Sequence, residues 1–167
     1  RGRYNMKLKS LLSVFLVFLA IASVAVPNAN PQTAESPSGI ISMVQSGTNN
    51  ISNVTVSPPN SINTTVVMDL RIDNASNVWA WKVFVNWSPS VLQLTKVKEG
   101  SFLKSDGENT AFIGGSSLLW NNTEGTIGGG VSATRMGATP VTDSSGILAT
   151  LTFNVTGFGT SSITLSG

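Results

Sequence analysis

The residues that could perform acid–base chemistry in this sequence are carboxylates, because it contains no histidine and no cysteine. Two of them, Asp106 and Glu108, lie close together in the segment LKSDGENT. A retaining glycosidase needs two carboxyl groups about 5.5 Å apart, one of which has a pKa raised by burial. The Asp-Gly step is instead typical of a turn, where solvent keeps both pKa values near their usual range. We therefore interpret this segment as a solvated hairpin loop and expect no enzyme activity.

Metal and cofactor chemistry have little support in the sequence. The usual zinc ligands, His and Cys, are absent, and the acidic segment lacks the dense Asp/Asn spacing of a calcium-binding EF-hand loop. The segment GTIGGG at residues 125–130 is not followed by the Lys-Ser/Thr of a phosphate-binding loop. Gly128, Gly129 and Gly130 are more typical of a strand bulge or of a flat surface on which a partner docks. We expect neither a metal ion nor a cofactor.

Tryptophan rings are the second group that could do chemistry, because a flat aromatic surface can stack on a sugar. Trp79, Trp81 and Trp87 share one face of a period-two pattern with valines, which predicts that they point into a core. Trp120 differs, since it lies in the polar segment SSLLWNNTEG. We therefore take Trp120 and Asn121, together with the glycines of 128–130, as the candidate surface for a carbohydrate or a protein partner.

Asparagines in Asn-x-Ser/Thr sequons are the third group. Because charged residues make up only 11% of the chain, attached sugar could replace charge as the solubilising group. Asn86 is a poor acceptor because Pro89 follows its Ser88. The remaining sequons predict glycosylation sites at Asn50, Asn53, Asn63, Asn74, Asn121 and Asn154.

Short strands are the elements that must position these residues. Strand patterns separated by Gly, Pro, Asn and Ser clusters occur at residues 53–57, 64–73, 78–87, 92–99, 109–114, 126–133, 146–155 and 161–165. In the third of these, Ala80, Lys82, Phe84 and Asn86 alternate with the predicted core residues and lie on the opposite face. No stretch after the apolar leader has a helical period. An all-β fold, an antiparallel β-sandwich over residues 51–167, is therefore predicted.

The N-terminal residues predict export. Residues 1–29 combine basic residues, an apolar run at 11–26 and small residues suited to cleavage after Ala25, which is typical of a signal peptide. Cleavage after Ala29 and retention as a membrane anchor stay open. Residues 30–50 read as a Pro/Ser/Asn-rich linker, in which 40–44 could form a short strand. We expect a secreted or cell-surface protein that meets the membrane only through an uncleaved leader.

Net charge gives no support for a nucleic-acid partner. The whole chain carries a formal charge of +2, but four of its ten basic residues precede the apolar run. Six basic residues then remain against eight acidic ones. The folded part is therefore slightly acidic, and it has no basic patch interleaved with aromatic residues.

Several segments over residues 53–165 carry a family resemblance. They are a corner in WKVFVNWSPSVLQL, a middle segment EGSFL and a late segment GILATLTFNV. The matching residues are Trp87, Pro89, Leu92, Gly100, Phe102, Leu103, Gly146, Leu148, Ala149, Leu151, Phe153 and Val155. In this order the chain resembles a cohesin domain. Ser88 stands where that family often has Asp, and the chain ends about where the family adds a final strand, so we interpret the sandwich as truncated before its last strand.

The resemblance implies a jelly-roll sandwich related to carbohydrate-binding modules of families 2 and 3. It also implies a non-catalytic module that binds a dockerin-like protein module through a flat sheet face, in the wider context of polysaccharide breakdown. Direct binding of a polysaccharide and a structural role in a surface layer or in adhesion are the alternatives. Fold alone does not choose between them.

Overall fold

The computed structural model describes residues 38–47, 53–56, 62–142 and 145–167. The predicted signal peptide and most of the predicted linker lie outside these residues. The strands are β1 (Ser38–Gln45), β2 (Asn53–Val56), β3 (Thr65–Ser76), β4 (Ala80–Asn86), β5 (Leu92–Glu99), β6 (Thr110–Ile113), β7 (Trp120–Asn121), β8 (Thr126–Ile127), β9 (Val131–Arg135), β10 (Ser145–Val155), β11 (Gly159–Ser162) and β12 (Thr164–Ser166). Two 3-10 turns, η1 (Phe102–Lys104) and η2 (Ser117–Leu119), lie between strands. None of the described residues belongs to a helix that could span a membrane.

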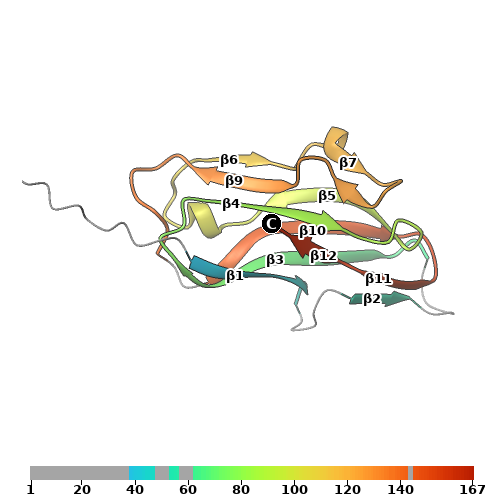
Figure 1. Cartoon of the computed structure of the whole chain (residues 1–167). Coiled ribbons are helices and arrows are strands. Elements are labelled where there is room, and N and C mark those ends of the chain that lie inside the picture. Colours follow the sequence, from blue (N-terminus) through green and yellow to red (C-terminus); the bar gives the residue numbers. More distant parts are fainter. Residues whose placement is uncertain (1–37, 48–52, 57–61, 143–144) are drawn as a thin grey trace, which may run out of the picture. The chain divides into compact units, whose positions relative to one another are not determined.

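The strands form two main sheets that pack face to face (Figure 1). One sheet has the order β1-β3-β10-β5, and the other has the order β6-β9-β4-β8-β7 with β12 on the free side of β4. A small sheet pairs β11 with β2, and the strand pairs are antiparallel. The predicted all-β antiparallel sandwich is confirmed.

Alternating apolar residues build the core between the sheets. In β10, Leu151, Phe153 and Val155 are almost completely buried, while the residues between them are only partly covered. Trp87 packs edge-on against Phe153, with ring centroids 5.4 Å apart. Fully burying side chains of this size contributes about 1.5–3 kcal/mol each. The two inner faces therefore hold the sandwich together, and the outer faces are left to other tasks.

The predicted core face of the β4 segment is confirmed from Trp81 onward and is wrong for Trp79. Trp79 is 43% exposed, whereas Trp81 is 7% exposed. The reason is an isolated bridge in which Val78 exchanges backbone hydrogen bonds with Val141. Val78 is consequently the residue that turns inward, at 3% exposure, and the alternation restarts at Ala80.

The corner after β4 is held by a residue far away in the sequence. The backbone N–H of Ser88 donates a hydrogen bond of 2.9 Å to Oγ of Ser161, which is fully buried. The carbonyl of Ser88 accepts the N–H groups of Val91 and Leu92. A buried serine on β11 thus ties this corner at the position where the family often has Asp.

Part of the predicted linker is a strand of the sandwich. Residues 38–45, within which only 40–44 were expected as a possible strand, form β1 and pair with β3. Met43 is 2% exposed and belongs to the core. Gly39 passes so close to β3 that a Cβ there would lie 2.7 Å from Cδ1 of Ile72. The described fold therefore starts earlier than residue 51.

Candidate protein-binding face

The outer surface of the sheet around β4 is the candidate functional site. Its residues point away from the core because they alternate with buried ones along each strand. We call this surface the β4 face; it consists of Ala80, Lys82, Phe84 and Asn86 of β4, Ser132 and Thr134 of β9, Ala111 and Ile113 of β6, and Thr164 and Ser166 of β12. Two rows of opposed residues cross it: Ala80, Thr134 and Ala111, then Lys82, Ser132 and Ile113.

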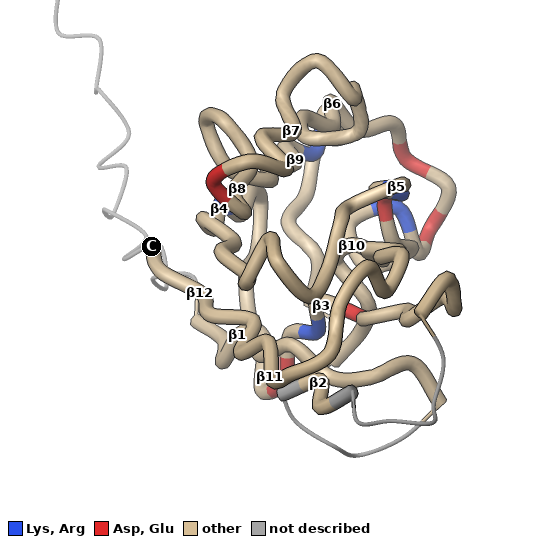
Figure 2. Tube along the Cα trace, turned by 90° about the vertical axis from the view of Figure 1, so that its right-hand side faces the viewer, with Lys and Arg blue, Asp and Glu red and all other residues tan. Residues whose placement is uncertain are grey.

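The β4 face is nearly uncharged, and its largest side chains other than Lys82 are apolar. Phe84 is 38% exposed and Ile113 is 55% exposed, and most of their neighbours are small side chains. The ionisable residues on the described strands of this sheet are Lys82 and Arg135, and Arg135 points inward at 4% exposure. Most of the chain is uncharged in Figure 2, including all of β12. This surface therefore offers Phe84 and Ile113 among small, mostly hydroxyl-bearing side chains, with a single positive charge.

Lys82 lies over the ring of Phe84. Its Nζ is 4.9 Å from the ring centroid, a distance at which the electron-rich face attracts a cation. Among the described residues, none of the ion pairs of the protein involves Lys82. The ammonium group therefore has no carboxylate partner within the described fold.

The glycine-rich segment shapes the middle of the sheet. The predicted strand 126–133 is interrupted, because Gly129 and Gly130 have φ of 76° and 78° and separate β8 from β9. A Cβ on Gly130 would lie 2.6 Å from the carbonyl oxygen of Val83, so only glycine lets the backbone pass β4 this closely. Gly128 and Gly129 are exposed. The candidate glycines thus border the β4 face and bend the strand beside it.

Trp120 and Asn121 lie at the β7 end of the same sheet. The indole N–H of Trp120 donates to the carbonyl of Gly114 at 2.8 Å, and the half-buried ring packs against the core. The side-chain oxygen of Asn121 accepts the backbone N–H groups of Thr123 and Glu124, both at 3.1 Å. Both side chains are therefore engaged in holding the β7–β8 hairpin.

The sequons are distributed over several parts of the fold. The exposed acceptors among the described residues are Asn63, Asn74 and Asn86, while Asn121 and Asn154 are half-buried. Asn53 lies in β2, and its side chain is outside the described set, as is the whole of Asn50. Asn86 is the one at the edge of the β4 face, opposite Thr164 of β12.

The acidic loop is organised by a buried arginine that the sequence analysis missed. Arg135 donates from Nη1 to Asp106 at 2.8 Å and from Nη2 to the second oxygen of the same carboxylate. It also donates to the carbonyls of Leu103 and Thr139, each at 2.7 Å. The hydrogen bonds from Arg135 lower the pKa of Asp106 to about 2. The expectation that solvent levels this pKa is therefore wrong.

This loop does not assemble an acid–base pair. A general acid needs a raised pKa, and the pKa of Asp106 moves the other way. Within the described ranges, no group of three or more His, Cys, Asp or Glu residues could hold a metal ion. The loop instead forms an ion pair between Asp106 and Arg135, which holds the loop against β9.

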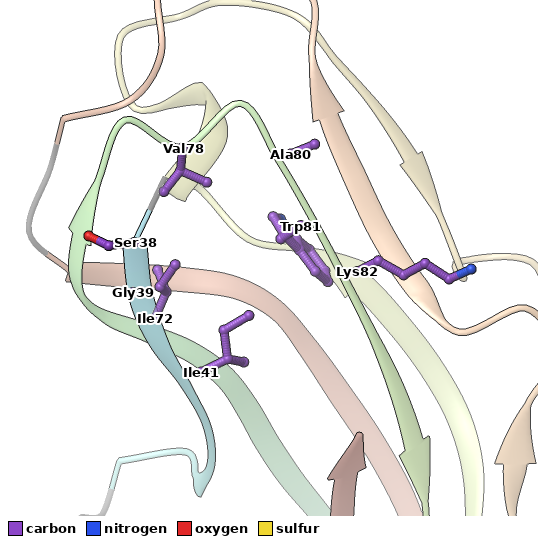
Figure 3. A pocket seen from close by; sticks show the side chains of 8 residues that line it. All are labelled: Ser38, Gly39, Ile41, Ile72, Val78, Ala80, Trp81 and Lys82. Atoms are coloured by element: carbon purple, nitrogen blue, oxygen red, sulfur yellow. The ribbon is translucent and has the colours of Figure 1, made fainter. Parts of the chain in front are cut away.

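A shallow cavity of about 280 Å³ lies between β1 and β4 (Figure 3). Its lining residues are mostly apolar: Ser38, Gly39, Ile41, Ile72, Val78, Ala80, Trp81 and Lys82. The side chain of Lys82 extends away from Ile41 and Ile72 (Figure 3). The cavity therefore presents mainly hydrocarbon and backbone, with Ser38 and Lys82 as its polar lining residues.

Comparison with known proteins identifies relatives of the fold. The cohesin domain family matches residues 50–167. A type II cohesin domain from the cellulosome of Acetivibrio cellulolyticus is 19% identical, with a TM-score of 0.55 over 78% of this chain and 76% of that one. The second type II cohesin module of the ScaA scaffoldin of the same organism is 15% identical, with a TM-score of 0.57 over 78% and 72%.

A third similar structure includes a bound partner. It is a type II cohesin–X–dockerin complex of Acetivibrio cellulolyticus, in which the matched chain is 13% identical, with a TM-score of 0.56 over 78% of each chain. At these identities the likeness establishes the fold. No protein of curated function matches the sequence.

Proposed function

Because this chain belongs to the cohesin domain family, whose members are non-catalytic binding modules, we propose that it is an exported module that binds a dockerin-like protein through the β4 face. The observation that carries the proposal is a nearly uncharged sheet face that exposes the large apolar side chains of Phe84 and Ile113 among small residues. Exposed apolar side chains support a protein interaction site, and the centres of interfaces are depleted of charge.

The partner class comes from the relatives. One similar structure is a cohesin–X–dockerin complex, so a dockerin-like module is the first partner to test. The β4 face suits such a partner geometrically, because β4 alone is about 23 Å long at roughly 3.3 Å per residue. A flat sheet of small side chains also lets a partner approach closely. We extend the role to assembly of polysaccharide-degrading proteins outside the cell.

The test is binding of the full chain to a panel of purified dockerin modules by calorimetry. Ile113→Glu places a carboxylate on the β4 face and should weaken binding at least tenfold, about 1.4 kcal/mol. Gln93→Glu makes a comparable change at an exposed position of β5 and should leave affinity unchanged. Failure of the wild type to bind any dockerin, or equal weakening by both variants, would reject the proposal.

Direct binding of a polysaccharide is the second candidate, and one observation favours it. Trp79 is 43% exposed next to β4, so it presents more ring surface to a sugar than half-buried Trp120 does. Retention of the protein on insoluble cellulose and chitin tests this. Retention lost in Trp79→Ala and kept in Trp120→Ala would support it, and no retention of the wild type would rule it out for these glycans.

We also propose that the exported protein carries N-linked sugar. The exposed acceptors Asn63 and Asn74 support this most directly, whereas Asn121 and Asn154 are partly covered. Glycopeptide mass spectrometry of protein purified from its own host should find sugar first on the exposed sites. Unmodified peptides at every sequon would overturn the proposal.

A further inference from the structure

We propose that Lys82 selects partners that present a carboxylate to the centre of the β4 face. The inference rests on the proposed binding function of that face and adds the chemistry that the partner must have. It makes Lys82 a specificity-determining residue that has no acidic partner among the described residues.

The position of Lys82 is central in the sheet. It lies directly opposite Ser132 of β9, which in turn lies opposite Ile113 of β6. Two positions along β4, Phe84 lies under the ammonium group, with Nζ 4.9 Å from the ring centroid. Small and apolar side chains therefore surround the charge, and a partner that covers Phe84 and Ile113 also covers Lys82.

Covering this charge has an energetic consequence. A buried ammonium group that finds no acceptor loses its hydration without compensation, which is strongly unfavourable. A carboxylate on the partner replaces the lost water with a charge-assisted hydrogen bond. A basic group at the same place is repelled, so one side chain can discriminate against wrong partners as well as favour the right one.

The described residues provide no internal substitute for that carboxylate. The described strands of this sheet carry no acidic residue. In the described loops next to these strands, Glu108 lies before β6 and Glu124 lies in the β7–β8 hairpin. Neither forms an ion pair with Lys82. Two copies packed symmetrically through this point would bring two Lys82 groups together, which favours a different, acidic partner.

The test uses a dockerin module that binds the wild-type chain in the panel above. Lys82→Met keeps the length and the apolar stem over Phe84 and removes the charge; Lys82→Arg keeps the charge. We expect Lys82→Met to bind about tenfold more weakly at about 50 mM salt, with the difference shrinking at about 500 mM salt, where charges are screened. Lys82→Arg should bind within about threefold of the wild type.

Controls separate the two proposals. Lys96→Met removes an exposed charge from β5 and should change neither affinity nor salt dependence. Lys82→Met that binds like the wild type at both salt concentrations, while Ile113→Glu loses binding, would overturn the inference and leave the binding face in place. If Ile113→Glu also binds normally, the proposed function fails instead. Thermal unfolding of each variant verifies that it is folded.

Discussion

The outer faces of the two sheets share an alternating backbone pattern and differ in their surface chemistry. We call the outer surface of the other sheet the β10 face; it includes Ile40, Ser42 and Val44 of β1, Asp69, Arg71 and Asp73 of β3, Thr150, Thr152 and Asn154 of β10, and Gln93, Lys96 and Lys98 of β5. This face also exposes a large apolar side chain, Ile40, but it carries five charged residues. Polar contacts link neighbouring strands there, as in the 2.8 Å hydrogen bond from Thr150 to Asp69. The β4 face has one exposed charge, on Lys82, and its largest side chains are Phe84 and Ile113.

This difference shows which side-chain properties folding requires, on the inner faces, and which it does not constrain, on the outer faces. Folding needs apolar residues on the inner faces and tolerates polar residues on the outer ones, as the β10 face demonstrates. Nothing in the packing of the core requires Phe84 or Ile113 to be apolar, since both point outward. Both side chains are therefore available for the partner contact that we propose.

A glycan attached to one face or the other should produce the largest difference in partner binding between the β4 face and the β10 face. Ser132→Asn creates the sequon Asn-Ala-Thr at the centre of the β4 face, and Gln93→Asn creates Asn-Leu-Thr on the β10 face. In a host that glycosylates both, we expect the first glycoprotein to lose dockerin binding altogether, because a bulky glycan covers the site. The second should bind as the wild type does. Calorimetry on the same two variants made in a host that does not glycosylate is the control, since without sugar both should bind; loss of binding in both glycoproteins would show that the faces are equivalent.

A smaller effect should come from the glycines that bend the strand beside β4. Gly130→Ala forces a Cβ into the carbonyl of Val83 as well as into a left-handed backbone conformation, which should cost about 3 kcal/mol in unfolding free energy. Gly129→Ala meets the same backbone penalty in open space and should cost about 1 kcal/mol. Urea unfolding measures both. Equal losses would mean that the close approach to β4 is relaxed in solution.

The sequence predicts the two faces better than it predicts their edges. Period-two alternation correctly separates Trp81 and Trp87, which are buried, from Lys82 and Phe84, which point outward. It fails at Trp79, because the register there depends on a bridge to Val141, and such non-local pairing leaves no local signal. The strand at residues 38–45 was also underestimated, since its pairing with β3 is equally non-local.

The site itself was only partly predictable. The resemblance to cohesins implies a flat sheet face as the partner surface, and the sequence draws attention to the glycines of 128–130, which border the β4 face. It did not indicate that Ile113 lies beside Ser132 and Lys82, because that row joins three separate strands. Nor did it indicate that Arg135 is buried. An arginine at a core position of β9 is satisfied here by Leu103, Asp106 and Thr139, which folding brings together.

The stability that Arg135 and Asp106 contribute should depend on pH, and this effect should be confined to one end of the sheet that carries the β4 face. Arg135 lowers the pKa of Asp106 from 3.8 to about 2, so the folded state binds this proton less readily than the unfolded state. The stabilisation is therefore complete above about pH 4 and is lost as the pH falls towards 2. Asp106→Asn lacks it at every pH and leaves Arg135, whose side chain is 1% exposed, without its carboxylate.

We accordingly expect Asp106→Asn to be less stable than the wild type near neutral pH, with the gap closing between about pH 4 and pH 2. Urea unfolding across this range measures the gap, and Glu99→Gln, which alters a carboxylate bound to Lys104 and Thr110, is the matched control. Hydrogen exchange should place the acid-induced loss at η1, β9 and the start of β6 before β3 and β10, because Arg135 ties the first group together. A gap that is unchanged at pH 2 would mean that the charge on Asp106 contributes nothing. Exchange that rises equally on both sheets would mean that the cluster supports the whole sandwich and not only the sheet that carries the β4 face.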